Sequence, residues 1–365
     1  MRIGIPTEVK NHEYRVGMTP AGVDALIDRG HSVLVQAGAG EGSRIGDDRY
    51  RAAGATLVDD AASVWSDAEL IVKVKEPIAS EYHYLSSDQT LMTYLHLAAD
   101  RPLTEALLAA GTTAVAYETV QLPDRSLPML SPMSEVAGRL SIAVGAYSLL
   151  RASGGRGTLM GGVAGAPPAD VVVIGGGVAG EHAAANAIGL GATVTVIDRS
   201  LQRLRELQIR YGTSIRTRAS TRLDIAEAVA GADLVIGSVL VPGAAAPKLV
   251  TDAMVATMRP GAVLVDIAID QGGCFEGSRP TTHDAPTFKV HDAVFYCVAN
   301  MPGAVPETST RALTNATLPY VLEVADRGWE AAIANDPALR LGLNTRAGAI
   351  THAGVAEALG LRFDG

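Results

Sequence analysis

The chain has 365 residues, a length typical of two domains of ~100–200 residues each. Hydrophobic residues make up 48% of it and charged residues 19%, which excludes a disordered chain and leaves enough apolar side chains for a sizeable core. The net charge is −9 and no Lys- or Arg-rich run occurs, so the basic surface that nucleic-acid binding needs is missing and we expect no nucleic-acid partner.

The sequence also argues against membrane insertion and secretion. No window of 18 or more apolar residues is free of charge or proline, so we expect no membrane span and no membrane partner. The first residues pass directly from a strand-like pattern to charges and lack the apolar run of a signal peptide. Cys274 and Cys297 share no metal-binding or redox spacing, and two free thiols are favoured over a bridge. We therefore expect a cytoplasmic protein.

Strand-like apolar runs alternate with segments of helical spacing along most of the chain. The expected strands are 32–36, 70–75, 90–95, 113–116, 170–174, 193–197, 233–236 and 262–267. The expected helices include 20–29, 101–110, 134–150, 180–190, 201–211 and 309–327. This alternation predicts an α/β fold with parallel sheets and right-handed crossovers.

Two proline-rich stretches, near residues 123–135 and 302–306, mark the expected domain boundaries. We expect a first part of a substrate domain over 1–130, a nucleotide-binding domain over 131–306, and the C-terminal helices of the substrate domain over 307–365. The nucleotide-binding domain would thus be inserted into a discontinuous substrate domain.

A glycine-rich turn between a buried strand and a helix is the strongest local signal. Gly175 permits the tight turn, Gly177 lets the backbone approach a pyrophosphate, and Gly180 allows close packing of helix and strand. Asp198 ends the next strand, where a carboxylate accepts hydrogen bonds from the ribose hydroxyls and repels a 2′-phosphate. We therefore predict that NAD is the cofactor. The alternative is a strand–helix turn without a ligand.

In open parallel sheets, ligands bind beyond the carboxyl ends of the strands. Later strands of the same domain should therefore contribute residues to the rim of the cofactor site. These residues are Ser238, Val239, Leu240, Ile267, Asp270, Val298, Asn300 and Met301.

Charged and titratable residues interrupt apolar segments of the first domain. Arg15 follows the opening strand, Lys73 and Lys75 should project from one face of a strand, and His96 ends another. Buried cations need partners, and a small anionic substrate is one such partner. The alternatives are a surface salt bridge for Arg15, a solvated edge-strand face for the two lysines, and a core histidine for His96.

The whole chain resembles the alanine dehydrogenases, which share their fold with the nucleotide-binding subunit of proton-translocating transhydrogenase. The resemblance rests on the ordered motifs at residues 2–16, 72–77, 94–97, 131–139 and 157–162, on the glycine-rich turn, and on residues 265–273. It implies two Rossmann-like domains, a homohexamer, and NAD-dependent oxidative deamination of L-alanine to pyruvate and ammonium, with the reverse amination.

The resemblance also implies residue roles. Arg15 and Lys75 hold the substrate carboxylate and carbonyl, His96 is the acid/base, and Asp270 is a second catalytic group. The implied cofactor contacts are Ser134, Val178, Asp198, Arg203, Ser220, Val239, Leu240, Arg279 and Asn300. Some members bind a metal through a Glu and a His four residues later; here Glu323 is followed by Arg327, so we expect no metal.

Other functions remain open at this point: a transhydrogenase subunit with a membrane partner, a non-catalytic NAD-responsive protein, or saccharopine-type dehydrogenation of a larger amino acid. Arg15, Lys75, His96 and Asp270 together favour the dehydrogenase of L-alanine, because a nucleotide-only site does not need a carboxylate clamp. His96 and Asp270 belong to different expected domains and are predicted to meet across the interdomain cleft.

Overall fold

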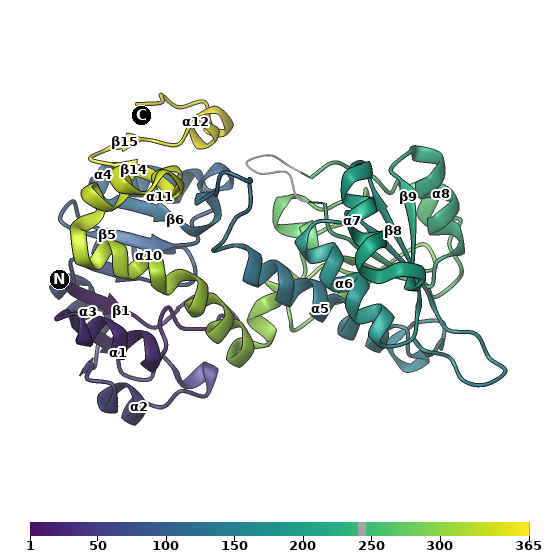
Figure 1. Cartoon of the computed structure of the whole chain (residues 1–365), viewed down its shortest axis with the longest axis horizontal. Coiled ribbons are helices and arrows are strands. Elements are labelled where there is room, and N and C mark those ends of the chain that lie inside the picture. Colours follow the sequence, from purple (N-terminus) through teal and green to yellow (C-terminus); the bar gives the residue numbers. More distant parts are fainter. Residues whose placement is uncertain (240–245, 365) are drawn as a thin grey trace. The chain divides into compact units, whose positions relative to one another are not determined.

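The computed structural model describes residues 1–239 and 246–364 (Figure 1). It divides into two compact units: Met1–Met133 with Gly303–Gly365 form unit 1, and Ser134–Pro302 form unit 2. Both units are α/β with mostly parallel sheets, which confirms the predicted fold class.

Unit 1 contains, among the residues described, an eight-stranded sheet in the order β15-β14-β6-β5-β4-β1-β2-β3. The strands from β6 to β3 are parallel, and β14 and β15 add an antiparallel edge. The strands are β1 Arg2–Ile5, β2 Ser32–Gln36, β3 Thr56–Val58, β4 Leu70–Val72, β5 Thr90–Thr93, β6 Thr113–Ala116, β14 Leu343–Arg346 and β15 Ala349–Ile350.

Apolar side chains of the unit 1 helices pack against side chains of the sheet, and some of these partners lie far apart in the sequence. Leu103 and Leu107 join Ile71, Leu91 and other strand residues in one buried apolar cluster. The helices are α1 Pro20–Asp28, α2 Asp47–Ala52, α3 Ala61–Asp67, α4 Arg101–Ala110, α10 Pro306–Asn335, α11 Pro337–Gly342 and α12 Ala353–Leu359. α10 is interrupted at Gly328, whose φ is 76°.

Unit 2 contains, over its described part, a seven-stranded sheet in the order β12-β13-β11-β10-β7-β8-β9. All neighbours are parallel except β12 and β13. The strands are β7 Asp170–Ile174, β8 Thr193–Asp198, β9 Ile215–Ala219, β10 Leu234–Gly237, β11 Val263–Asp266, β12 Thr287–Val290 and β13 Ala293–Tyr296. The helices are α5 Ser131–Ser148, α6 Val178–Gly189, α7 Leu201–Tyr211, α8 Arg222–Gly231 and α9 Asp252–Val255.

Both faces of the unit 2 sheet are buried, which explains the unbroken apolar run of β7. Val171 and Val173 belong to one apolar cluster, which also includes residues of α5, α6 and α7. Val172 and Ile174 belong to a second cluster with residues of α8 and α9. The sheet therefore places the carboxyl ends of β7, β8, β10 and β11 along one edge, where the glycine-rich turn follows β7.

Two strands of unit 1 are shorter than the sequence predicts. β4 ends at Val72, so Lys73 and Lys75 follow the strand instead of projecting from one of its faces. β5 ends at Thr93, and His96 lies in the left-handed region with φ 52°, directly before the 3₁₀ helix η3 Leu97–Ala99. Among the described residues, no helix is both long and apolar enough to span a bilayer.

Candidate active site

Arg15 is a buried cation in unit 1. Its Nε donates to Glu13 Oε1 at 2.6 Å and its Nη2 to Glu13 Oε2 at 2.5 Å, a paired geometry in which both side chains are almost fully enclosed. Nη1 lies 3.1 Å from the Met133 sulfur. Burial opposes the charge, but Glu13 outweighs it and raises the pKa of Arg15 further. A surface salt bridge is therefore the wrong interpretation of Arg15.

Lys73 is also buried, and the structure supplies its partners from the chain itself. Its Nζ donates to Glu81 Oε1 at 2.9 Å and lies 3.4 Å from Glu8 Oε2. Burial alone would lower the pKa of Lys73, but Glu8 and Glu81 offset it and raise the pKa. A solvated edge is thus wrong for Lys73, and its partners are Glu8 and Glu81 of the same chain.

Glu8 links this ion pair to the segment that carries Lys75. Its Oε1 accepts a hydrogen bond from Val74 N at 2.6 Å, and its Oε2 accepts one from Lys75 N at 3.3 Å. The Lys75 side chain is half-buried, and no hydrogen bond or ion pair to its Nζ occurs among the described residues. The backbone of Lys75 is therefore fixed while its ammonium group stays available to a ligand.

His96 is held by two carboxylates. Glu118 Oε1 accepts a hydrogen bond from His96 N at 2.7 Å, which stabilises the uncommon backbone conformation. Glu76 Oε2 lies 3.4 Å from Nδ1 of the ring, and the His96 side chain is 37% exposed. A core histidine is therefore the wrong interpretation, because more than a third of the side chain is exposed.

The charges around Glu76 favour its ionised form. Burial raises its pKa, but the His96 contact and the charges of Lys75 and Lys10 outweigh burial and hold the pKa below its usual range. Lys10 Nζ donates to Glu76 Oε1. Unit 1 thus brings Lys75 and His96 together around Glu76, and Arg15 is near enough to Glu8 for their charges to interact.

In unit 2, the glycine-rich turn has the geometry that a dinucleotide requires. Gly175 has φ 98°, and a Cβ on Gly180 would lie 1.8 Å from the Gly175 carbonyl oxygen. A Cβ on Gly177, by contrast, would meet nothing within 4 Å, so its backbone faces open space at the start of α6. Free N–H groups at this helix end fit a pyrophosphate.

Asp198 ends β8 beside this turn. Its Oδ2 accepts a hydrogen bond from Gly176 N at 2.7 Å, and its Oδ1 accepts one from Ser200 N at 2.7 Å. Ser220 N donates to the Asp198 carbonyl oxygen at 3.0 Å, which brings β9 to the same edge. This arrangement fits an adenosine ribose beside the carboxylate.

The Arg203 guanidinium group is hydrogen-bonded to the same turn and to carboxylates of the chain. Its Nε donates to the Gly176 carbonyl oxygen at 2.6 Å, and its Nη2 donates to Glu181 on α6. Nη1 donates to Glu206 at 3.1 Å. The guanidinium therefore stabilises the turn and has two carboxylates that compete with any 2′-phosphate.

The strand-end residues of unit 2 differ in exposure. Asp270 is exposed in the 3₁₀ helix η7 Ile267–Gln271, whereas Ile267 and Val239 are half-buried. Ser238 is buried, and its Oγ donates to the carbonyl oxygens of Ile174 at 3.0 Å and Gly175 at 2.8 Å, so it stabilises the turn. Leu240 lies outside the described residues.

The other expected cofactor contacts lie on separate elements. Val298 and Met301 are buried in the core of unit 2. Arg279 stacks over the Phe288 ring at 4.2 Å, and Asn300 has φ 64°. Ser134 is half-buried on α5, and Val178 is 40% exposed at the start of α6.

Reasoning from the sequence missed the carboxylates Glu8, Glu76, Glu81 and Glu118. Glu8 and Glu76 stand in motifs with Lys10 and Lys75, and a search for counter-ions to the predicted buried cations would have found them. Asp266 was also missed. It is fully buried and accepts hydrogen bonds from Ala268 N and Cys274 N, which fixes the start of the loop that carries Asp270. Burial raises its pKa.

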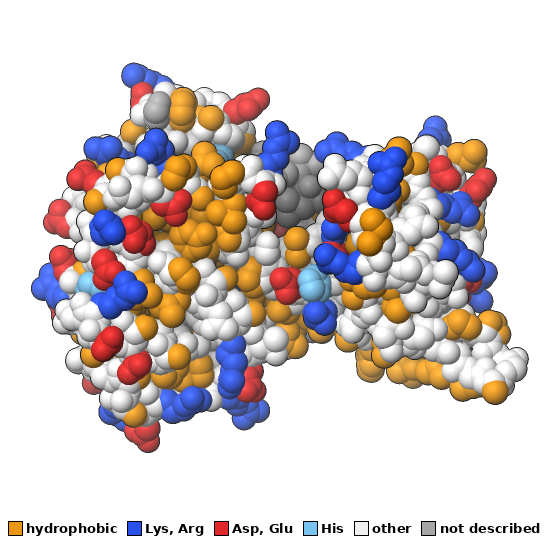
Figure 2. All heavy atoms as spheres, viewed as in Figure 1, with side chains coloured by type: hydrophobic (Ala, Val, Ile, Leu, Met, Phe, Trp, Pro, Cys, Tyr) orange, Lys and Arg blue, Asp and Glu red, His pale blue; other side chains and the backbone are white. Residues whose placement is uncertain are grey.

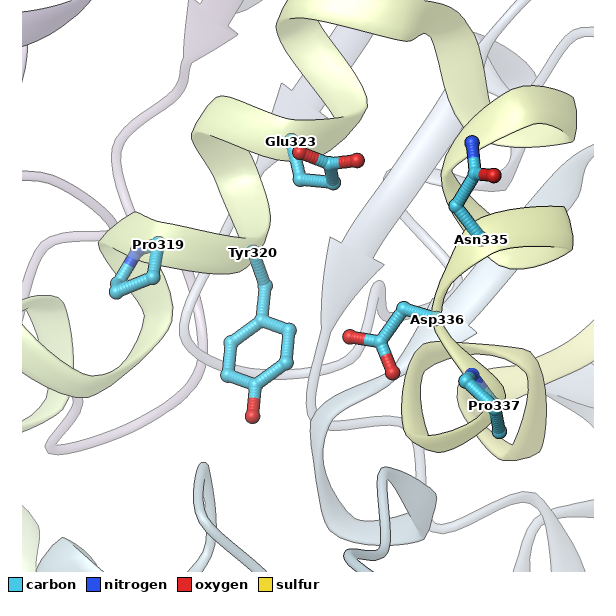
Figure 3. Close-up of a pocket in the computed structure, with 6 residues that line it drawn as sticks. All are labelled: Pro319, Tyr320, Glu323, Asn335, Asp336 and Pro337. Carbon is cyan, nitrogen blue, oxygen red and sulfur yellow. The ribbon is translucent and has the colours of Figure 1, made fainter.

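A surface pocket elsewhere in unit 1 contains none of the predicted site residues. Figure 3 shows Tyr320 and Glu323 of α10 on one side of it, and Asn335, Asp336 and Pro337 on the other. Glu323 Oε1 forms an ion pair with Arg327 Nε at 2.7 Å, so this carboxylate already has a cationic partner. Within the described part of the chain, no cluster of His, Cys, Asp and Glu has the form of a metal site.

Comparison with known proteins covers both units. The family model described as "Alanine dehydrogenase/PNT, N-terminal domain" matches residues 4–137. The model described as "Alanine dehydrogenase/PNT, C-terminal domain" matches residues 141–353. An alanine dehydrogenase of Mycolicibacterium smegmatis is 64% identical over 363 residues, covering 100% of this chain and 98% of the relative. One from Halomonas elongata is 57% identical with the same coverage.

Solved structures agree with these matches. An L-alanine dehydrogenase structure superimposes with a TM-score of 0.95 at 50% identity and covers 99% of both chains. A transhydrogenase from Sinorhizobium meliloti superimposes with a TM-score of 0.82 at 28% identity, covering 97% of this chain and 99% of that one. The resemblance seen in the sequence is confirmed, and the chain belongs to the alanine dehydrogenase/PNT family.

Proposed function

We propose that this protein catalyses the NAD-dependent oxidative deamination of L-alanine to pyruvate and ammonium, and the reverse reductive amination. The observation that carries this proposal is 53–64% identity over the full chain to proteins named alanine dehydrogenase. The glycine-rich turn with Asp198 supports NAD as the cofactor, since the carboxylate suits a ribose diol and repels a 2′-phosphate.

The residues of unit 1 supply substrate binding and proton transfer. Lys75 stabilises the developing carbonyl oxygen of the substrate with its ammonium group. Arg15 provides a second positive charge for the carboxylate, with Nε and Nη2 engaged by Glu13 and Nη1 beside the Met133 sulfur. His96 transfers protons, a function worth ~10²–10⁴-fold in rate.

The residues of unit 2 bind the dinucleotide and orient the amine. Gly175, Gly177 and Gly180 receive the pyrophosphate at the start of α6, and Asp198 binds the ribose. When bound, NAD supplies the acceptor for the hydride that leaves the substrate Cα. Asp270 is the exposed carboxylate of this unit that orients ammonium or water.

A transhydrogenase subunit is the second candidate, because a transhydrogenase superimposes on most of the chain. Its 28% identity is far below the 64% of an alanine dehydrogenase. The available Lys75 ammonium also favours the dehydrogenase, since a protein that binds only nucleotides has no substrate carbonyl for it to stabilise.

We also propose a cytoplasmic homo-oligomer, with the hexamer that the family resemblance implies. Apolar side chains of unit 2 are exposed in the single chain and available to an interface between copies: Tyr147 is 68%, Leu159 60% and Val163 65% exposed. Two buried free cysteines fit a reducing compartment. Light scattering after gel filtration gives the number of copies, and a monomer at micromolar concentration would contradict the oligomer.

The assay that tests the function is oxidation of NADH by purified protein with pyruvate and ammonium present together. We expect turnover to require all three, and L-alanine to reduce NAD in the reverse direction. NADH oxidation that needs a second nucleotide in place of pyruvate would instead support the transhydrogenase.

A further inference from the structure

Glu76 is the carboxylate that faces the ring of His96. It follows Lys75 directly, is 7% exposed, and has two differently placed oxygens. Oε1 accepts a hydrogen bond from Lys10 Nζ. Oε2 lies 3.4 Å from His96 Nδ1 and, among the described residues, is buried with no hydrogen bond at all. An unsatisfied buried carboxylate oxygen is costly, so its position beside Nδ1 favours a proton on that nitrogen.

The backbone of His96 is fixed independently of this contact. Glu118 accepts hydrogen bonds from the N–H groups of Leu95 and His96, at 3.2 and 2.7 Å. The ring centroid lies 6.0 Å from that of Tyr94. No partner of Nε2 occurs in the part of the chain that the structure describes, and the side chain is 37% exposed. Nδ1 therefore faces the buried carboxylate, while Nε2 has no partner among the described residues.

We propose that Glu76 is a positioning residue for His96: its carboxylate keeps a proton on Nδ1, so that Nε2 is the nitrogen that exchanges protons with the substrate. This inference rests on the proposed function, in which His96 is the acid/base. In each cycle Nε2 accepts one proton and later returns it, while the Nδ1 proton stays in place. The ionised Glu76 stabilises the imidazolium that forms between these two steps.

Other charged groups near Glu76 bear on the pH dependence. Lys10 and Lys75 carry positive charges close to Glu76. The negative charge of Glu76 contributes to raising the pKa of the Tyr82 phenol. Glu118 is a second carboxylate near His96. Lys10 is 41% exposed on its side chain, so it anchors Glu76 but contacts water as well. Of these groups, Glu76 is the one that contacts the His96 ring nitrogen, so removal of its charge has the most direct effect.

The first experiment uses the unmodified protein with histidine labelled by ¹⁵N. Imidazole nitrogen shifts report which nitrogen carries the proton, and the signal missing from His96→Asn identifies His96. We expect the neutral ring to hold its proton on Nδ1. A proton on Nε2 instead would overturn the inference, and this readout depends neither on catalysis nor on the folding of a Glu76 variant.

The second experiment compares Glu76→Gln with Glu81→Gln, which removes an equally buried carboxylate that pairs with Lys73. For Glu76→Gln we expect kcat to fall about 10–100-fold, less than for loss of His96 itself, with the KM for pyruvate changed less than about 3-fold. In the direction of L-alanine oxidation, in which the neutral ring accepts a proton, the acidic limb of the kcat/KM profile should move to lower pH, because the imidazolium loses its anion. Glu76→Asp should recover part of the rate.

The two failures are distinguishable. If Glu76→Gln keeps the pH profile and His96 tautomer of the unmodified protein, or if Glu81→Gln shifts the profile equally, the positioning role is wrong and the proposed function stands. If the unmodified protein fails to aminate pyruvate, the proposed function is wrong, and the imidazole spectrum still tests the contact between Glu76 and His96.

Discussion

Buried cations in unit 1 are stabilised by carboxylates that lie both near and far along the chain. Arg15 pairs with Glu13, two residues away, whereas Lys73 pairs with Glu8 and Glu81. Removing one partner of such a pair leaves an uncompensated buried charge and costs about 3–5 kcal/mol. Substitution of these residues therefore changes stability as well as binding, and the tests must measure both.

We predict that Arg15→Lys lowers kcat/KM for pyruvate about 10–100-fold, because an ammonium cannot make the paired bonds of a guanidinium and leaves Glu13 less well neutralised. Steady-state kinetics give the loss, and fluorescence should show nearly unchanged NADH binding. Arg29→Lys is the control, since Arg29 is a half-exposed partner of Asp326. A normal KM for pyruvate with reduced stability would mean that Arg15 serves only to neutralise Glu13.

Asp198 is predicted to determine the choice of cofactor. In Asp198→Ala the carboxylate beside Gly176 is lost, so the ribose diol loses its acceptor and a 2′-phosphate loses a repulsive charge. We expect the preference for NAD over NADP to shrink at least about 10-fold, equal to about 1.4 kcal/mol, mostly through KM. Asp224→Ala, on α8, is the control. Equal use of both cofactors by the unmodified protein would contradict the assignment.

At the scale of elements, local sequence predicts secondary structure best where caps and apolar spacing agree. The bounds of β2, β6, β7, α4 and α7 coincide with the predicted ranges. Asp100 caps α4 and Ser200 caps α7, and both are visible in the sequence. The end of β4 was missed because Lys73 turns toward Glu8 and Glu81, and a partner 65 residues away leaves no local signal. For the same reason Glu118 was not assigned to the site, since its contact with His96 joins segments 22 residues apart.

The packing of α6 on the glycine-rich turn gives a test at this scale. In Gly180→Ala the new Cβ would lie 1.8 Å from the Gly175 carbonyl oxygen, so the helix must shift. We expect a stability loss of at least about 1–3 kcal/mol, measured by urea unfolding, and a much weaker affinity for NADH. Gly189→Ala on the same helix meets nothing within 4 Å and should be neutral or stabilising by about 0.5–1 kcal/mol. Equal effects of the two substitutions would contradict this packing argument.

At the scale of the whole molecule, Glu76 links the site to acid stability. Burial opposes its charge, but His96, Lys75 and Lys10 hold its pKa below the unfolded value of 4.5. A carboxyl with a lowered pKa stabilises the fold fully above about pH 4.5 and loses that contribution as the pH falls through the folded pKa. The stability difference between the unmodified protein and Glu76→Gln should thus be about 1.5–3 kcal/mol at pH 7 and shrink below pH 4.5. A constant difference from pH 7 to pH 4 in urea unfolding would contradict this linkage.

The proposed roles fall on residues of both units: His96 lies in unit 1 and Asp270 in unit 2. We predict that His96→Ala and Asp270→Asn each reduce turnover at least about 10²-fold, because each removes a group that moves a proton or orients the amine. Folding, oligomeric state and NADH affinity should stay close to those of the unmodified protein, since the His96 ring and Asp270 are partly or fully exposed. Asp252→Asn, an exposed carboxylate of unit 2, is the matched control and should keep full activity. More than about a tenth of the original rate in both active-site variants would exclude the roles proposed for this pair, because acid/base catalysis accounts for at least ~10²-fold.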